Sequence, residues 1–326
     1  MKHNRIIIAG GSGFLGRALA ATLTQRGHET VILTRNPEAY KGAGRAVEWD
    51  GKTLDESWTA ELEGARALIN LTGKNVNCRQ NRRNREAILQ SRVDSVRVLG
   101  EALRLVYRPP EVWVQAGSLA IYGDAGDRIC DEAGFIPDEY PTDVCRAWEE
   151  ALGEAIRPEM RWVVLRIGFV LGNAGGALPT LARLTKLGLG GRIGTGQQWI
   201  SWIHLTDMLR LFVEAIENDH VQGICNATGL QPVTNTEFMA ALRKALGAPV
   251  GIPAPAWLMR LVAPLINADP DLALNGRRGL PCRIHGIGFG FRHHNLDTAL
   301  EDLLKKPAKP AREKAWAETF ARPDRV

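Results

Sequence analysis

The sequence has little cysteine and no long apolar run. Its 326 residues include 5 cysteines, an odd number without any Cys-x-x-Cys spacing, which argues against a disulfide framework or a zinc site and favours a reducing compartment. No stretch approaches the ~18 apolar residues that span a bilayer. The N-terminus enters a strand pattern directly, without the apolar region of a secretory signal. We therefore expect a cytoplasmic protein with no membrane partner and no metal.

A strong excess of one charge is also missing. Lys+Arg 41 against Asp+Glu 36 gives a formal net charge of +5, which falls short of the concentrated charge of a dedicated nucleic-acid binder. The basic cluster in residues 79–85 contains no aromatic side chain that could stack on bases. We expect a small-molecule substrate and no nucleic-acid partner, and a homodimer is left open.

Short β-branched runs alternate with longer helical patterns along the first half of the chain. This alternation predicts βαβ units and a parallel sheet. The expected fold class is α/β, with a Rossmann-type doubly wound parallel sheet. The elements are expected as strands at Arg5–Ala9, Thr30–Thr34, Ala46–Trp49, Ala67–Leu71, Glu111–Ala116 and Trp162–Arg166, and as helices at Phe14–Arg26, Ile88–Leu105 and Val144–Ile156.

The strongest local signal is a run of glycines between the first strand and the first helix. Such glycines allow a tight turn, a close approach of the backbone to a pyrophosphate, and close packing of helix on strand. The helix N-terminus then offers free N–H groups to the anion. The context of one βαβ unit distinguishes the motif from a plain turn. We predict a dinucleotide site built from Gly10, Gly13, Phe14, Leu15 and Gly16.

The end of the second strand indicates which dinucleotide binds. An NAD site usually places an acid there to hold the ribose 2′-hydroxyl, but this strand ends in Thr34 and Arg35, with no acid before Glu38. A guanidinium can pair with a 2′-phosphate, which a carboxylate would repel. NADP(H) is therefore the expected cofactor, the alternative being that Arg35 is a solvated surface residue.

The character of the sequence changes after Gly172. Glycines crowd residues 188–196 and prolines crowd residues 249–255, and both residue types punctuate structure. We expect residues 1–172 to form the NADP(H)-binding Rossmann domain. Residues 173–326 would form most of a smaller, mixed α/β substrate lobe, and this boundary is soft because the chain is free to return to the first domain.

Short motifs along the whole chain carry a resemblance to a known family. They are Gly10-x-x-Gly13-x-x-Gly16, Asn70-Leu71-Thr72-Gly73, Ser118-Leu119-Ala120-Ile121-Tyr122-Gly123, Leu165-Arg166-Ile167-Gly168, Ser91-Arg92, Cys145-Arg146-Ala147-Trp148-Glu149, Trp202-Ile203-His204 and Gly288-Phe289-Gly290-Phe291-Arg292. In these motifs the sequence resembles the extended short-chain dehydrogenase/reductase superfamily, and within it the "epimerase family" branch, some of whose members are named cell division inhibitor. The resemblance implies that Leu71, Thr72, Gly73, Ser118, Ile167 and Gly168 line the cofactor.

The sequence departs from this family at the catalytic pair. Family chemistry uses Tyr-x-x-x-Lys, whose tyrosine exchanges a proton with the substrate, but here the two positions fall on Pro141 and Cys145. The loss of a general acid typically costs ~10²–10⁴ in rate. Ser118 is retained as a candidate catalytic residue, and Tyr140 is a second candidate for the proton donor. Cys145 is expected to be a small buried side chain rather than a nucleophile.

The sequence says less about the residues that contact the substrate. Lys74, Trp199 and His204 are candidates for substrate contacts, although a structural role for His204 between the lobes is the favoured alternative. Asp207 is expected to bond to backbone or to cap the following helix. The arginine that grips a sugar-nucleotide diphosphate in this family is replaced by Ile200, which argues against a nucleotide sugar.

Three hypotheses for the function remain open. The first is an NADP(H)-dependent oxidoreductase acting on an unidentified small substrate. The second is a catalytically silent, NADPH-binding regulatory or partner-binding protein, which the missing tyrosine and lysine favour. The third and weakest is an epimerase that uses its bound cofactor in a closed redox cycle.

Overall fold

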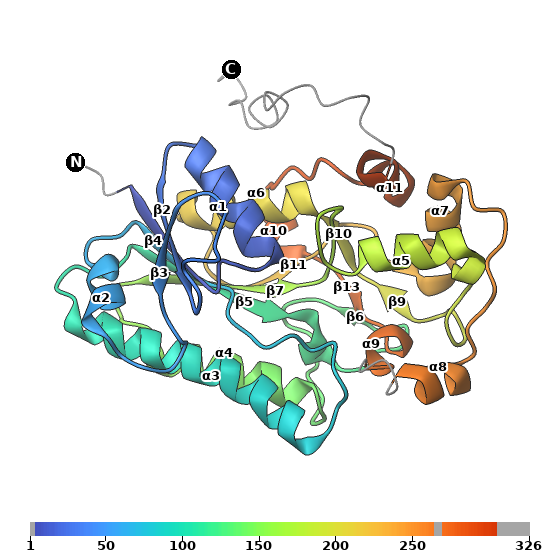
Figure 1. The fold of residues 1–326 in the computed structure, drawn as a ribbon, viewed down its shortest axis with the longest axis horizontal. Coiled ribbons are helices and arrows are strands. Elements are labelled where there is room, and N and C mark those ends of the chain that lie inside the picture. The colour runs from blue at the N-terminus through green and yellow to red at the C-terminus, as the bar shows by residue number, and fades with distance from the viewer. Residues whose placement is uncertain (1–3, 264–268, 305–326) are drawn as a thin grey trace.

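A parallel sheet runs through the middle of the protein (Figure 1). The computed structural model describes residues 4–263 and 269–304. The sheet has seven strands in the spatial order β11-β7-β5-β4-β1-β2-β3, all paired in parallel. The strands are β1 (Arg5–Ala9), β2 (Glu29–Thr34), β3 (Arg45–Glu48), β4 (Ala67–Asn70), β5 (Val112–Ser118), β7 (Arg161–Ile167) and β11 (Gly223–Ala227).

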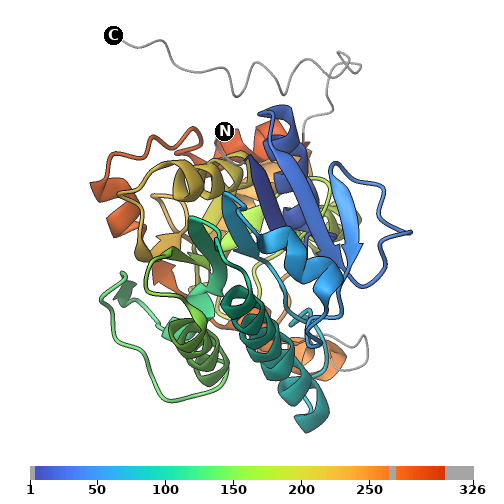
Figure 2. The ribbon, with the colours of Figure 1, turned by 90° about the vertical axis from the view of Figure 1, so that its left-hand side faces the viewer.

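Helices cover both faces of this sheet. α1 (Phe14–Gln25) packs with α6 (Leu205–Glu217) on one face, and α3 (Arg82–Leu105) packs with α4 (Thr142–Ala155) on the other, as Figure 2 shows for the second pair. The side chains of β1 alternate between the two apolar cores, because successive residues of a strand point to opposite faces. The short elements on the α3 side are α2 (Glu56–Thr59), η1 (Ala60–Leu62) and η2 (Leu119–Tyr122).

The predicted fold class and elements are confirmed. All six expected strands and three expected helices are present, and most of their ends lie within two residues of the expected positions. The exception is α3, which begins at Arg82 rather than at Ile88 because the Asn81 side chain accepts a hydrogen bond from the Asn84 amide (2.9 Å) and caps the helix.

The second half of the chain builds a smaller mixed α/β lobe and also returns to the sheet through α6 and β11. Its strands form short pairs, β8 with β10 and β9 with β12, and its β13 pairs with β6 from the first half of the chain. Figure 1 shows α5, α7, α8 and α9 gathered at one end of the molecule. The elements are β6 (Ile129–Cys130), β8 (Phe169–Leu171), β9 (Trp199–Ile200), β10 (Trp202–His204), β12 (Val233–Thr234), β13 (Arg278–Gly279), α5 (Leu178–Leu184), η3 (Thr185–Leu189), α7 (Asn235–Leu246), α8 (Ala256–Val262), α9 (Asp271–Leu274), α10 (Cys282–Gly286) and α11 (Leu296–Leu304).

The topology brings the predicted site residues to one edge of the sheet. Parallel strands end on the same side, so the turns that follow β1, β4, β5 and β7 are neighbours there. In doubly wound sheets, ligands bind outside the carboxyl ends of the strands. Within the described parts of the chain, none of the helices combines the length and the apolarity that crossing a bilayer requires.

Candidate cofactor and substrate site

Two glycines of the dinucleotide turn are required by the fold itself. Gly10 has φ +71°, and a Cβ on it would lie 2.9 Å from the Thr72 Cα atom. A Cβ on Gly16 would lie 2.6 Å from the carbonyl carbon of Gly11, which would prevent α1 from packing against the turn. Real Cβ atoms do not approach backbone this closely, so both positions need glycine.

Gly13 is different, because the protein leaves the space beside it open. A Cβ there would meet only the Gly10 carbonyl oxygen, at 3.8 Å. Gly13 begins α1 with no side-chain cap and no acidic residue in the first turn, which leaves the free N–H groups of the helix available to an anion. The nearby Thr72 hydroxyl is shielded from solvent and has no hydrogen-bond partner in the described parts of the chain. These features fit a bound pyrophosphate.

The end of β2 lies next to this turn. The Thr34 hydroxyl donates to the Ser12 hydroxyl (3.1 Å), which joins β2 to the glycine loop. Arg35 follows immediately and is exposed; its guanidinium forms no hydrogen bond or ion pair with another residue in the described ranges. Phe14 and Leu15 pack against the core from the first turn of α1. The Phe14 ring is covered by the loop after β8, since a Cβ on Gly175 would lie 2.6 Å from it.

The ends of β4, β5 and β7 form the other side of the site. The Leu71 amide donates to the Ala9 carbonyl (2.9 Å), which places Leu71, Thr72 and Gly73 beside the glycine turn. Ser118 is paired with Ile167 at the ends of β5 and β7, and its hydroxyl accepts a hydrogen bond from the Ala120 amide (3.1 Å). Ser118 is half-buried, so its hydroxyl remains free to donate.

Gly168 follows Ile167 and makes a tight contact with the second lobe. A Cβ on Gly168 would collide with the carbonyl oxygen of Ser201 and would lie 3.2 Å from a methyl group of Leu119. Leu119, which follows Ser118, therefore packs against Gly168, and Gly168 packs against Ser201 of the second lobe. This contact brings the predicted nicotinamide end of the site against the lobe.

The positions of the missing catalytic pair have no acid or base. Pro141 precedes α4, and Cys145 is buried in its first turns, where burial raises the pKa of the thiol to about 11. The Tyr140 hydroxyl forms a hydrogen bond with the Gln80 side chain (2.8 Å), and the Arg85 guanidinium lies over its ring. Burial raises the pKa of Tyr140. Tyr140 bonds to Gln80 and Ser118 to Ala120, so no hydrogen bond links the two side chains to each other. A shared catalytic role of Tyr140 and Ser118 stays a prediction.

Tyr140 also lines an open cavity of about 800 Å³ between the beginnings of α3 and α4. The other residues that line it are Gln80, Arg82, Arg85, Glu86, Leu89, Asp143, Val144 and Ala147.

Arg92 on α3 lies beside the predicted site, although the sequence did not predict it as a site residue. Its guanidinium carbon lies 3.0 Å from where a Cβ on Gly73 would be. Its Nη1 atom donates to the carbonyls of Lys74 (3.2 Å) and Ile88 (3.0 Å), and its guanidinium lies over the Trp148 ring. In the described parts of the chain no carboxylate pairs with it, and burial lowers its pKa. The Ser91-Arg92 motif was the available signal.

Lys74 and Trp199 are engaged with the protein. The Lys74 ammonium donates to the Asn84 side chain (2.8 Å), at the start of α3. The Trp199 indole donates to Asp127 (2.8 Å), and Arg278 lies over its ring. Both side chains are half-buried, and substrate contacts by either remain predictions.

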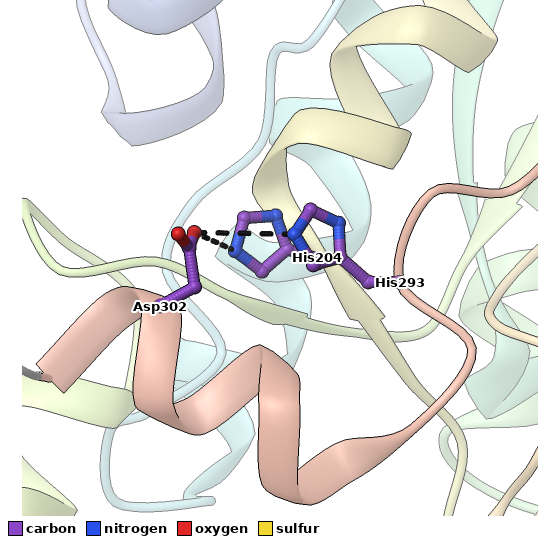
Figure 3. A group of neighbouring side chains, drawn as sticks. All are labelled: His204, His293 and Asp302. Carbon is purple, nitrogen blue, oxygen red and sulfur yellow. Dashed lines mark ion pairs between the residues drawn. The ribbon is translucent and has the colours of Figure 1, made fainter.

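His204 lies in a cluster with His293 and Asp302 (Figure 3). The two imidazole rings stack with centroids 3.6 Å apart, and the Nε2 atom of His204 lies 3.2 Å from an Asp302 oxygen. The other nitrogen, Nδ1, accepts from the Thr206 amide (3.1 Å) and caps α6. Both ring nitrogens of His204 thus face protein groups, as a structural role requires, and a substrate contact by His204 stays a prediction. The cap is His204 and not Asp207, which accepts instead from the Arg292 and His293 amides.

The same cluster has the composition of a metal site. Ligand atoms of His204, His293 and Asp302 all lie within 4.8 Å of one another. However, the planes of the two rings are 16° apart, so their lone pairs run side by side instead of converging on one ion. The arrangement is therefore a pair of stacked imidazoles beside a carboxylate rather than a preformed metal centre.

Comparison with known proteins places the chain among proteins of related sequence and fold. Residues 6–227 match the profile of the NAD dependent epimerase/dehydratase family, and residues 254–303 match a domain of unknown function, DUF1731. The epimerase family protein SDR39U1 of Bos taurus is 34% identical over 307 residues, which cover 92% of this chain and 99% of the relative.

Solved structures also share the fold of this chain. The crystal structure of human epimerase family protein SDR39U1 (isoform 2) with NADPH is 30% identical with a TM-score of 0.82, covering 92% of this chain and 99% of that one. The nucleoside-diphosphate sugar epimerase from Corynebacterium glutamicum is 28% identical with a TM-score of 0.75, covering 98% of this chain and 63% of that one.

Proposed function

Because the chain belongs to the NAD dependent epimerase/dehydratase family, we propose that it is an NADP(H)-binding oxidoreductase of the extended short-chain dehydrogenase type that acts on a small substrate. The open space beside Gly13, together with the unpartnered Thr72 hydroxyl, carries this proposal. A buried hydroxyl without a partner costs free energy, and a phosphate oxygen would supply the missing acceptor. The crystal structure of the related human protein with NADPH supports the same cofactor.

The preference for the phosphorylated cofactor rests on Arg35. Its exposed guanidinium follows Thr34 at the end of β2, where NAD-binding folds of this type usually have an acid. A cation that has no partner among the described residues suits a 2′-phosphate at this place. Arg92, beside Gly73 and near Cys145, would add a positive charge on the nicotinamide side, where the family has its lysine.

When bound, the nicotinamide would supply or accept a hydride. The protein would contribute a hydrogen bond from Ser118 to the substrate oxygen, since this hydroxyl accepts from the Ala120 amide and can donate outward. Cys145 would contribute no charge, because burial keeps the pKa of its thiol at about 11. Proton transfer is left to water, to Tyr140 or to the substrate.

Nucleotide titration tests the proposal. We expect the purified protein to bind NADPH saturably and more tightly than NADH, as measured by calorimetry. The Arg35→Gln variant should lose roughly tenfold or more in NADPH affinity, the typical value of a charge-assisted pair, while NADH binding stays the same. Arg97→Gln, an exposed arginine on α3, is the control. Failure of the wild-type protein to take up either nucleotide would overturn the proposal.

A second candidate function is a catalytically silent NADPH-binding regulator. The observation that favours it is the pair Pro141 and Cys145, neither of which can act as an acid at neutral pH. NADPH oxidation across a panel of carbonyl compounds separates the two functions. An oxidoreductase should turn over at least one compound and lose most of that rate in Ser118→Ala, whereas a regulator should bind NADPH without consuming it.

An epimerase acting on a nucleotide sugar is less well supported. One related structure is named as such an epimerase. In this chain, however, Ile200 stands at the position of the diphosphate-binding arginine and pairs with Val233 between β9 and β12. An epimerase with a closed redox cycle would be purified with nucleotide bound and would consume no external NADPH, which mass spectrometry of the denatured protein can check.

A further inference from the structure

Arg277 is held in a fixed place by the backbone on either side of it. Its amide donates to the Trp199 carbonyl (3.0 Å), and its carbonyl accepts from the Ser201 hydroxyl (2.7 Å). The same hydroxyl accepts from the Gly279 amide (2.8 Å). Ser201 therefore clamps the segment before and within β13.

This segment packs against the proposed nicotinamide end of the site. A Cβ on Gly279 would lie 2.9 Å from a Leu119 methyl group, and one on Gly168 would collide with the Ser201 carbonyl. Leu119 directly follows Ser118, so the segment that carries Arg277 closes the site from the side of the second lobe.

The guanidinium of Arg277 differs from a paired one. In the described parts of the chain it forms no hydrogen bond and no ion pair, and its Nε atom is shielded from solvent without an acceptor. Two carboxylates, Asp124 and Glu139, act on it electrostatically but lie beyond ion-pair distance. They attract its charge without satisfying its donors.

Arg166 is an example of a buried arginine whose guanidinium nitrogens are all hydrogen-bonded within the protein. Arg166 on β7 donates from Nε and Nη2 to the two oxygens of Glu149, and from Nη1 to the Tyr122 hydroxyl, each at 2.8 Å. All of its edges are used, as expected for a buried charge. The contrast indicates that the unsatisfied donors of Arg277 are available for a ligand.

Arg277 and Arg92 approach the same thiol from different parts of the fold. Both act electrostatically on Cys145, although burial dominates and keeps that thiol neutral. One arginine comes from α3 of the Rossmann sheet and the other from the segment before β13. Within the described residues, Cys145 is therefore near two arginines that form no ion pair with a carboxylate.

We propose that Arg277 binds an anionic group of the substrate, a carboxylate or a phosphate, between the β13 segment and the Ser118 end of the site. This inference rests on the proposed function, because it names the class of substrate whose reacting carbon would lie beside Ser118. A guanidinium presents a planar fork of donors that matches both anions. The anion would satisfy the donors that the protein leaves unpaired.

Anion titrations test this site independently of cofactor binding. Malonate and inorganic phosphate serve as carboxylate and phosphate probes, with neutral malonamide as the uncharged control, on the protein alone and after NADPH loading. We expect saturable binding of at least one anion and none of malonamide. Arg277→Gln should weaken that binding roughly tenfold or more, Arg277→Lys should weaken it less, and NADPH affinity should remain at the wild-type value.

The matched control is Arg278→Gln, since this neighbouring side chain lies over the Trp199 ring and should leave anion binding unchanged. Thermal unfolding separates a ligand-binding role from a structural one. Removal of an unpaired cation should leave the melting temperature of Arg277→Gln unchanged or higher, whereas a structural role would lower it.

Equal anion binding by wild type and Arg277→Gln, or no saturable anion binding by wild type, would overturn the site. The malonate result is read on the protein without cofactor, so it remains decisive even if NADPH fails to bind. Phosphate binding is assigned to this site only for the part that Arg277→Gln removes, because the glycine turn is itself a proposed phosphate site. If the protein bound the anion but not NADPH, the proposed function would be overturned while the anion site would still stand. The stronger of the two probes identifies the anion as carboxylate or phosphate.

Discussion

At the scale of single residues, Gly13 and Gly16 are expected to respond differently to the same substitution. In Gly13→Ala the new methyl group meets only an oxygen at 3.8 Å, so stability should hardly change while NADPH affinity falls at least tenfold. In Gly16→Ala the methyl group overlaps the Gly11 backbone, which should destabilise the fold by about 1–3 kcal/mol. Thermal unfolding without nucleotide and NADPH titration measure the two effects. Unchanged NADPH binding in Gly13→Ala would contradict the pyrophosphate site.

Glu149 provides a second prediction at this scale. Its carboxylate is the acidic partner of Arg166, whose side chain is only 2% exposed. Glu149→Gln would leave a buried guanidinium without its countercharge, and such losses typically cost about 3–5 kcal/mol. Urea unfolding should show this loss. The control is Asp138→Asn. The Asp138 side chain is 89% exposed and pairs with Arg146, so this change should alter stability by less than about 1 kcal/mol. Similar effects of both variants would argue against a buried charge pair.

At the scale of elements, the cluster that joins α6 to α11 should make stability depend on pH. Burial, with the charge of the stacked His293, lowers the pKa of His204 from 6.5 to about 4. Between these values the unfolded chain binds the proton and the folded chain does not. Stability is therefore full above pH 6.5 and is lost as the pH falls toward 4. The facing charged groups are Asp302, Asp207 and His293.

The measurement is urea unfolding at pH 7 and pH 5, where we expect this histidine to contribute a loss on the order of 1–2 kcal/mol. His204→Asn retains a good capping residue for α6 and removes the titrating ring, so the difference between the two pH values should shrink. His220→Asn, at an exposed histidine, should leave the difference unchanged. If the stability of His204→Asn depended on pH as strongly as that of the wild type, the titrating group would be another residue.

At the scale of the whole molecule, the sequence predicts local features better than pairings across the chain. The glycine turn and the strand ends are local patterns, and the strands appear close to where the patterns place them. The start of α3 was missed because its arginine-rich first turns lack apolar periodicity, and only the Asn81 cap marks it. An ion pair of Arg92 or Arg277 with a carboxylate would depend on residues far away in the sequence. The spacing of residues along the chain therefore does not predict whether such a pair forms.

The return of the chain to the sheet leads to a prediction about autonomous folding. Residues 1–172 contain six of the seven sheet strands but lack β11 and α6. Without α6, the side chains of Leu19 and Leu23 on α1 lose their cover by Met208 and Phe212, with which they share one apolar core. A fragment ending at residue 172 would therefore expose a large apolar face, which favours association over folding.

We expect the 1–172 fragment to aggregate or to unfold without a cooperative transition. A fragment of residues 1–230 contains all seven strands of the sheet together with α6. It should unfold cooperatively, at a lower temperature than the full chain, because it lacks α11 and the Asp302 contact to His204. Circular dichroism melts with size-exclusion chromatography compare the two fragments. Cooperative melting of a monomeric 1–172 fragment would show that α6 and β11 are dispensable, and that the Rossmann domain ends where the sequence pattern changes.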